Sequence, residues 1–157
     1  MKIIFELIRN QNFLRYIKYL DVSNPLDKNL PDIPCSGIIN DGKNDGCIYP
    51  LPFSDKILIE TSVILFFNPH LPNRLQNIVS EDVYTLDIIV PNQYWYIYSI
   101  GAWRPYLIIY EVAQSIDRKR IAGLGDVEII KVSTPYKAAD GYSGVTIFIK
   151  VNSSTVK

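Results

Sequence analysis

The stretch RPYLIIYEVAQSIDRKRIAGLG, residues 104–125, predicts one amphipathic helix whose start and end can both be read. Pro105 falls in the first helical turn, where its missing amide proton costs no hydrogen bond. Apolar side chains then recur at helical spacing along one side: Ile108, Ile109, Val112, Ala113 and Ile116. The basic run Arg118–Arg120 suits the exposed carbonyls of the helix C-terminus, and Gly123–Gly125 supplies the turn that follows. Because a lone helix must bury its apolar side, we expect the rest of the chain to supply a sheet.

Four segments have the alternating pattern of strands, two before this helix and two after it. They are residues 56–67, 83–90, 126–133 and 144–151. Residues 74–82 are expected to form a crossing loop, and the pair Asp140-Gly141 to form the tip of a hairpin between the last two strands. Neither pair of strands is joined through a helix, which favours antiparallel pairing. The predicted fold class is therefore α+β, a largely antiparallel four-stranded sheet with helices packed on one face.

The first 55 residues are expected to add a helical N-terminus and a long exposed loop. Residues 1–20 have a helical period that loses its phase near Arg9, which indicates either two short helices or one bent helix. Asn10 is a suitable N-cap for a second helix. Residues 21–34 contain three prolines and form an irregular connector. Residues 35–55 hold the turn-forming sequences Asn-Asp-Gly at 40–42 and 44–46, so we expect a protruding loop.

Length and composition fit a single domain over residues 1–157, with its core in 56–151 and a frayed tail at 152–157. The chain is 48% hydrophobic and 20% charged, which argues against disorder. Its 16 basic and 16 acidic residues cancel, which makes a dedicated DNA-binding protein a poor fit. No apolar run approaches the roughly 20 residues that span a bilayer. We therefore expect a soluble protein, made in the cytoplasm, that makes no membrane contact.

The sequence lacks the motifs of an enzyme, a cofactor site or a metal site. Cys35 and Cys47 are twelve residues apart; a disulfide is possible, but thiols of a non-secreted chain are more often free, and zinc would need four closely spaced ligands. Pairing of either thiol with His70 is a weaker interpretation than a surface histidine. Glu60 and Asp87 lie within strand patterns, where a solvent-facing charge explains each of them. We expect no enzymatic activity and no cofactor.

Several segments together resemble the small neck or tail-terminator subunits of tailed bacteriophages. These are LIRNQNFLRYIKYLDVSNPL near the N-terminus, VYTLDIIVPNQYW, RPYLIIYEVAQSID, GLGDVEIIKVS and YSGVTIFIKV. The resemblance implies a structural virion protein that forms a ring of six or twelve copies between head and tail, with a channel for DNA passage. It also implies portal, adaptor or tail ring proteins as partners, transient non-specific DNA contact, a location in the virion neck or tail, and no catalytic residues.

Candidate interface residues follow from this interpretation. They lie in the expected loop, in the aromatic sequence 94–98, on the side of the helix away from its apolar stripe, and in the basic run: Asn40, Asp41, Asn44, Asp45, Tyr94, Trp95, Trp103, Tyr106, Tyr110, Arg118, Lys119 and Arg120. Alternatively, the rings of 94–98 pad the helix entry, and the basic run only complements the helix C-terminus. A competing function is a cytoplasmic adaptor or small-ligand binding module in which residues 94–98 form the pocket wall.

Overall fold

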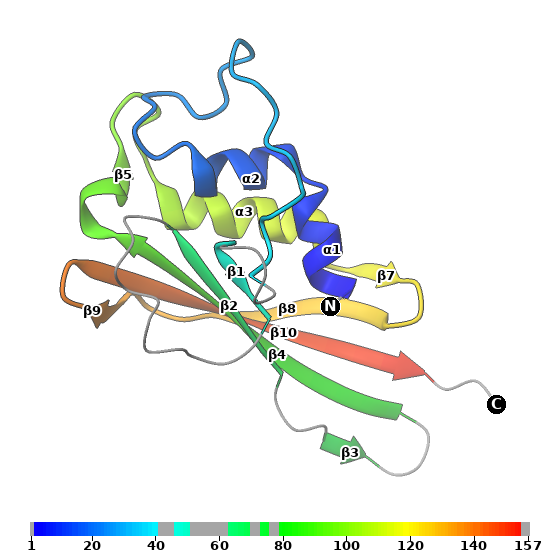
Figure 1. Ribbon diagram of the computed structural model, residues 1–157. Helices are drawn as coiled ribbons and strands as arrows, with labels where there is room; N and C mark the ends of the chain where they lie inside the picture. The colour runs from blue at the N-terminus through cyan, green and yellow to red at the C-terminus, as the bar shows by residue number, and fades with distance from the viewer. Residues whose placement is uncertain (1, 41–45, 51–62, 70–72, 76–78, 155–157) are drawn as a thin grey trace.

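Three helices cover one face of a curled sheet in the computed structural model, which describes residues 2–40, 46–50, 63–69, 73–75 and 79–154 (Figure 1). The helices are α1 (Lys2–Ile8), α2 (Gln11–Lys18) and α3 (Arg104–Ile116). The interpretation of the N-terminus as two helices is confirmed. Asn10 is the N-cap of α2, because its Oδ1 accepts a hydrogen bond from the Phe13 amide at 3.2 Å.

Eight strands of the described residues form the main sheet. They are β1 (Ile48–Tyr49), β2 (Ile64–Pro69), β3 (Asn73–Leu75), β4 (Val79–Pro91), β7 (Lys119–Ile121), β8 (Gly125–Val132), β9 (Tyr136–Ala139) and β10 (Tyr142–Ser154). The order across the sheet is β1-β2-β4-β10-β8-β7, with β3 added to β4 and β9 to β10. Strands β4 and β10 pair along their whole length, from Tyr142 opposite Pro91 to Ser154 opposite Val79. This long central pair is the template on which the shorter strands form.

The expected four-stranded antiparallel sheet is therefore wrong. The sheet is mixed, because β1 pairs with β2 in parallel, while the other strand pairs that the structure describes are antiparallel. An isolated bridge between Ile39 and Ile48 is also parallel. The extra strands arise where the sequence indicates loops: β3 and the start of β4 lie in the expected crossing loop at 74–82, and β9 lies just before Asp140-Gly141. Strands of two to four residues are too short to display an alternating pattern and form only because a longer strand pairs with them.

The prediction that the basic run Arg118–Arg120 forms the C-terminal end of α3 is wrong. Helix α3 ends at Ile116, Arg118 adopts a positive φ of 54°, and the chain turns back into the edge strand β7. Gly123, with φ of 69°, lies in the turn between β7 and β8 instead of the turn that leaves the helix. Lys119 still complements the helix C-terminus, because its Nζ donates to the Gln114 carbonyl at 2.5 Å.

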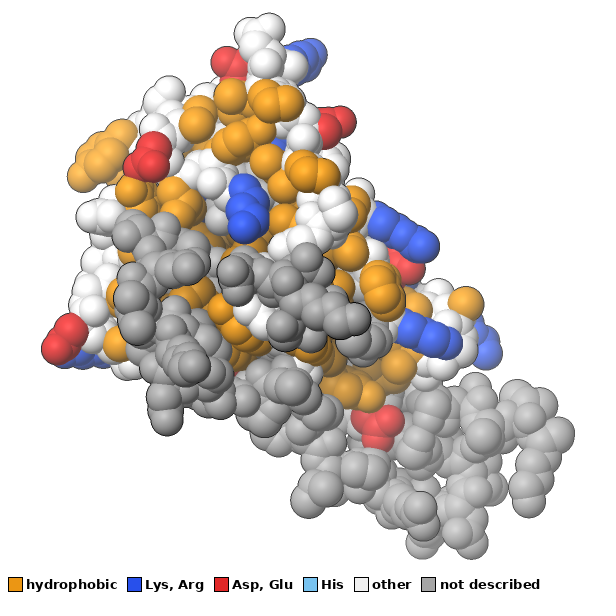
Figure 2. Space-filling view, in the orientation of Figure 1, with side chains coloured by type: hydrophobic (Ala, Val, Ile, Leu, Met, Phe, Trp, Pro, Cys, Tyr) orange, Lys and Arg blue, Asp and Glu red, His pale blue; other side chains and the backbone are white. Residues whose placement is uncertain are grey.

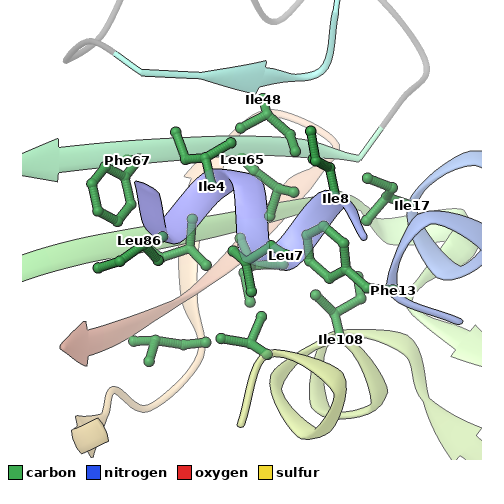
Figure 3. Close-up of a cluster of buried hydrophobic side chains, with 14 of the residues drawn as sticks. Ile4, Leu7, Ile8, Phe13, Ile17, Ile48, Leu65, Phe67, Leu86 and Ile108 are labelled. Carbon is green, nitrogen blue, oxygen red and sulfur yellow. The ribbon is translucent and has the colours of Figure 1, made fainter. Parts of the chain in front are cut away.

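The hydrophobic core lies between the helices and the inner face of the sheet. Alternating residues of the two central strands point into it: Leu86, Ile88 and Val90 of β4, and Val145, Ile147, Ile149 and Val151 of β10. Leu86 lies opposite Ile147, and Ile88 lies opposite Val145. Figure 3 shows Ile4, Leu7 and Ile8 of α1 packed against Leu65, Phe67 and Leu86 of the strands, with Phe13 of α2 and Ile108 of α3 beside them. The opposite face carries a smaller buried cluster of Ile64, Phe66 and Ile89.

The expected loop at 35–55 and the expected tail at 152–157 are only partly within the described residues. In the first, Ile38, Cys47 and Ile48 are buried, and the amide of Asn40 donates to the Ile48 carbonyl at 2.8 Å. Gly46 approaches the backbone of Ile38 so closely that a Cβ atom would lie 2.2 Å from its carbonyl oxygen. Strand β10 continues to Ser154, so the first part of the expected tail is paired with β4.

Replacing Asn10 by alanine is expected to destabilise the fold. Its Nδ2 donates to Glu111 Oε2 at 2.9 Å and contacts Ser115 Oγ at 3.0 Å, so one side chain caps α2 and joins it to α3. The lost cap costs about 1 kcal/mol and the unpaired Glu111 carboxylate, which is buried, about 1–3 kcal/mol more. Urea denaturation measures the loss. The control Asn12→Ala removes only a 3.5 Å contact to Glu111, and equal effects of the two variants would contradict this account.

Candidate functional site: an exposed aromatic surface at the start of α3

The candidate site is built by the short segment that joins the central strand β4 to helix α3. After Pro91 the chain forms a 3-10 turn (Asn92–Tyr94) and then a two-stranded hairpin of β5 (Tyr96–Ile97) and β6 (Ala102–Trp103). Tyr96 lies opposite Trp103 in this hairpin, and α3 begins at the next residue. Gly101, with φ of 71°, allows the tight turn at the hairpin tip. The hairpin therefore holds its side chains at a fixed place beside the helix.

Arg104 anchors this hairpin to the end of helix α2. Its side chain is only 2% exposed. Nη1 donates to the carbonyls of Tyr16 at 2.7 Å and Tyr19 at 3.3 Å, Nη2 donates to Leu20 at 3.2 Å, and Nε donates to Tyr94 at 2.9 Å. Burial lowers the pKa of Arg104 to about 10, so the guanidinium stays protonated at neutral pH. Its charge is stabilised by the backbone carbonyls at the C-terminus of α2, which have no amide of a following helical turn to bind.

Several large side chains around the hairpin remain exposed, and together with the half-buried Tyr96 they define what we call the aromatic surface: Tyr98, Ile100, Trp103, Tyr106 and Tyr110. Tyr98 is 87% exposed, Tyr110 is 58% exposed and Trp103 is 51% exposed. Tyr96 lies between two of the other rings, because the edge contacts to Tyr98 and Trp103 both have centroid distances of 5.0 Å. Figure 2 shows hydrophobic side chains that project from the molecule at the left, beside β5.

A groove of about 360 Å³ runs along the aromatic surface, between the hairpin and the residues that follow α2. Its wall includes Asp21, Tyr94, Tyr96, Tyr98 and one side of Arg104, and we call it the Asp21 groove. The Tyr94 hydroxyl donates to Asp21 Oδ1 at 2.6 Å, a hydrogen bond that raises the pKa of Tyr94. Asp21 is solvent-exposed, and among the described residues no hydrogen bond reaches its second oxygen, Oδ2. That oxygen is free to accept from a partner.

A second, more open hollow of about 490 Å³ lies beside Trp103. Trp95 and Trp103 line it together with Tyr136 of β9. The Tyr136 ring covers Gly144 of β10, where a Cβ atom would lie 2.8 Å from the ring. The aromatic surface thus continues from α3 across the hairpin to the sheet.

The structure brings together five of the candidate interface residues and separates the others from them. Tyr94, Trp95, Trp103, Tyr106 and Tyr110 lie at or next to the aromatic surface. The basic run Arg118–Arg120 is exposed beyond the opposite end of α3. Asn40 lies at the base of its loop, bonded to Ile48. The remaining three, Asp41, Asn44 and Asp45, lie outside the described residues.

The described residues that the sequence suggested as catalytic or metal-binding candidates do not lie together at the aromatic surface. Cys35 is exposed and Cys47 is buried, both as free thiols, and burial raises the pKa of Cys47, which lowers its reactivity. Asp87 accepts hydrogen bonds from Thr146 at 2.6 Å and Asn68 at 3.0 Å on the face of the sheet away from the helices. His70 and Glu60 lie outside the described residues. Within the described ranges, no three His, Cys, Asp or Glu side chains are grouped as metal ligands.

A family model named YomW matches residues 10–151, which is most of the chain. This protein belongs to the YomW family. YomW is a phage-type gene product of the Bacillus SPbeta kind, so the resemblance to phage proteins is confirmed at that level. No curated protein matches the sequence. None of the helices in the described part of the chain is long and apolar enough to cross a membrane.

The matched YomW region runs from the cap of α2 into β10 and includes the whole candidate site. Sequence reasoning missed three of its residues: Asp21, Arg104 as a buried anchor, and Tyr136. Asp21 and Tyr94 are 73 residues apart, and nothing in a single sequence indicates that they meet. For Arg104 the sequence offers one signal of burial: this charged residue stands directly before Pro105, at the start of the helix whose apolar stripe is buried.

Replacing Arg104 by methionine is expected to lower the free energy of unfolding by about 3 kcal/mol or more, because several buried carbonyls lose their donor at about 1–3 kcal/mol each. Arg104→Lys keeps the charge but offers three donors in a different geometry, so an intermediate loss is expected. The exposed control Arg118→Met should change stability by less than about 0.5 kcal/mol. Thermal and urea unfolding measure all three variants, and a fully stable Arg104→Met variant would refute the anchoring role.

Proposed function

We propose that this protein is a structural component of a phage virion, a subunit of an oligomeric ring in the neck or tail. In this role it joins head to tail and leaves a channel through which DNA passes. The observation that carries the proposal is the aromatic surface, which exposes several large rings beside each other on a rigid part of the fold. Membership of a family of phage-type gene products supports it.

The aromatic surface has the chemistry of a protein interface. Contiguous exposed apolar patches on a folded domain indicate contact with another molecule, and tyrosine and tryptophan are the residues that interfaces favour. The rings are not needed to fill the core, because the buried cluster between helices and sheet is formed by other side chains. The hairpin that carries them is held by Arg104, so little conformational entropy would be lost when a partner binds.

The charge of the chain agrees with a channel subunit. A ring that lets DNA slide through it must not bind phosphates tightly, and this chain has equal numbers of acidic and basic residues. Phage portal, adaptor or tail ring proteins are the expected neighbours. Contact with DNA would be transient and non-specific, and the chain would act through its interfaces instead of through catalysis.

A second candidate function is a cytoplasmic adaptor or small-ligand binding module. One observation favours it: the Asp21 groove has about 360 Å³ and is lined by Tyr94, Tyr96 and Tyr98, as a ligand pocket would be. Its open rim and its continuity with the exposed rings suit a protein partner better than an enclosed small molecule.

The mass of the protein in solution and its copy number in assembled particles test the proposed ring. Sedimentation and native mass spectrometry should give a closed oligomer of several copies, and electron microscopy of particles should place it between head and tail. A protein that remains monomeric both alone and in the presence of neck or tail partners would contradict the proposed ring and favour the ligand-binding module.

Truncating the exposed rings should weaken assembly without weakening the fold. Tyr98→Ala and Tyr110→Ala should each change the free energy of unfolding by less than about 0.5 kcal/mol, because both side chains are mostly in water. We expect at least one of them to reduce association by about tenfold, or about 1.4 kcal/mol, as interface hot spots do. The matched control is Phe5→Ala, another exposed ring, on α1. Equal assembly of all three variants would argue against the aromatic surface as an interface.

A further inference from the structure

We propose that the edge strand β7 of one copy docks into the Asp21 groove of the next, so that the arginines of β7 and its approach meet the carboxylate and rings of the aromatic surface. This inference rests on the proposed ring and names the contact that would build it. It follows from two complementary surfaces at opposite ends of α3, one cationic and one acidic and aromatic.

The donating surface is the turn and strand that follow α3. Strand β7 is the last strand of the sheet in the order that the described residues show, so one of its edges lacks a neighbouring strand there. Arg118 and Arg120 are exposed, whereas the ammonium of Lys119 is held at the Gln114 carbonyl. Arg118 has a positive φ of 54° and lies in the turn between the end of α3 and β7, with its side chain in solvent. Two arginines are thus presented at a free sheet edge.

The accepting surface has what a guanidinium requires. Asp21 is exposed at the groove wall, with Oδ1 held by the Tyr94 hydroxyl at 2.6 Å and Oδ2 free among the described residues. Tyr96 and Tyr98 stand beside it and offer ring faces and edges. Arginine pairs with carboxylates through its planar fork and stacks on aromatic rings, so one side chain can use both features at once. The exposed carboxylate and the rings of the groove wall are complementary to an arginine side chain, while the guanidinium of Arg104, which also lines the groove, is buried and bound to backbone carbonyls.

The two surfaces cannot meet within one chain. Helix α3 has 13 residues and lies between them, which separates them by about 20 Å. Figure 1 shows β5 and β7 at opposite ends of this helix. Each copy therefore carries one donating and one accepting surface, and docking of unlike surfaces is the head-to-tail contact that closes into a ring when the rotation between copies allows it.

Two double variants that each destroy one surface provide the test. The acceptor variant Asp21→Ala/Tyr98→Ala keeps β7, and the donor variant Arg118→Ala/Arg120→Ala keeps the groove. Each alone should associate at least about tenfold more weakly than the natural chain. When they are mixed in equal amounts, the intact β7 of the first can dock into the intact groove of the second. The expected product is a one-to-one dimer that grows no further, seen by native mass spectrometry of isotope-labelled chains.

The control Arg9→Ala/Lys131→Ala also removes two exposed cations, from other faces of the molecule, and should assemble normally. Circular dichroism checks that all variants are folded. If the natural chain assembles and both double variants assemble equally well, this contact is wrong while the ring stands. If both variants fail and their mixture stays monomeric, the two surfaces do not bind each other. If the natural chain is a monomer in solution and is present as single, separate copies in particles, both the ring and the contact between β7 and the Asp21 groove are wrong.

A photo-crosslinking residue at position 98 gives an independent readout on the natural interface. Because about 20 Å separates the two ends of α3, a cross-link from position 98 to residues 118–121 must join two copies. Cross-linked peptides that combine labelled and unlabelled chains support the contact. Cross-links only to other segments overturn it, as does a donor variant that assembles normally but loses salt-dependent binding to duplex DNA, which would assign the arginines to DNA.

Discussion

The guanidinium of Arg104 lies where three separate segments of the chain meet, and the arrangement of the helical layer depends on it. It donates to carbonyls of Tyr16, Tyr19 and Leu20 at the end of α2, and to Tyr94 before the hairpin. No carboxylate forms an ion pair with it among the described residues. A buried guanidinium without acceptors around it would be too costly to keep, so the carbonyls must stay in place for the side chain to remain buried. The constraint works in both directions, because those carbonyls otherwise lack partners.

Asn10 performs the corresponding role at the opposite end of α2. Its oxygen caps the helix and its amide binds Glu111 of α3, so α2 is fastened to α3 at both of its ends. The sheet below is organised by one long pair, β4 with β10, whose inner residues supply most of the strand side of the core. The helical layer is thus built around α3, and the sheet is built around the β4–β10 pair, to which the short strands are added.

The sequence predicts those parts of the fold that are set by local periodicity. The start of α3 at Arg104, the cap at Asn10, the Asp140-Gly141 turn and the exposed positions Trp103 and Tyr110 all follow from spacing or turn chemistry. Strands β1, β3, β7 and β9 could not be found this way, because their stability comes from partners far along the chain. The same holds for the site: its rings were visible in the sequence, whereas the meeting of Asp21 with Tyr94 depends on how α2 docks.

Helix α3 connects the aromatic surface to strand β7 in a fixed geometry. Both of its ends are tied to other elements, by Arg104 at the start and by Asp117 at the end, where Oδ1 accepts from the Ile129 amide of β8 at 2.8 Å. The aromatic surface and β7 are therefore held at a fixed distance and direction relative to each other. In an assembly built by unlike surfaces, that direction determines the rotation from one copy to the next and hence the number of copies that closes the ring. A subunit of this kind needs a stiff connection between its two contacts more than it needs a large area in either of them.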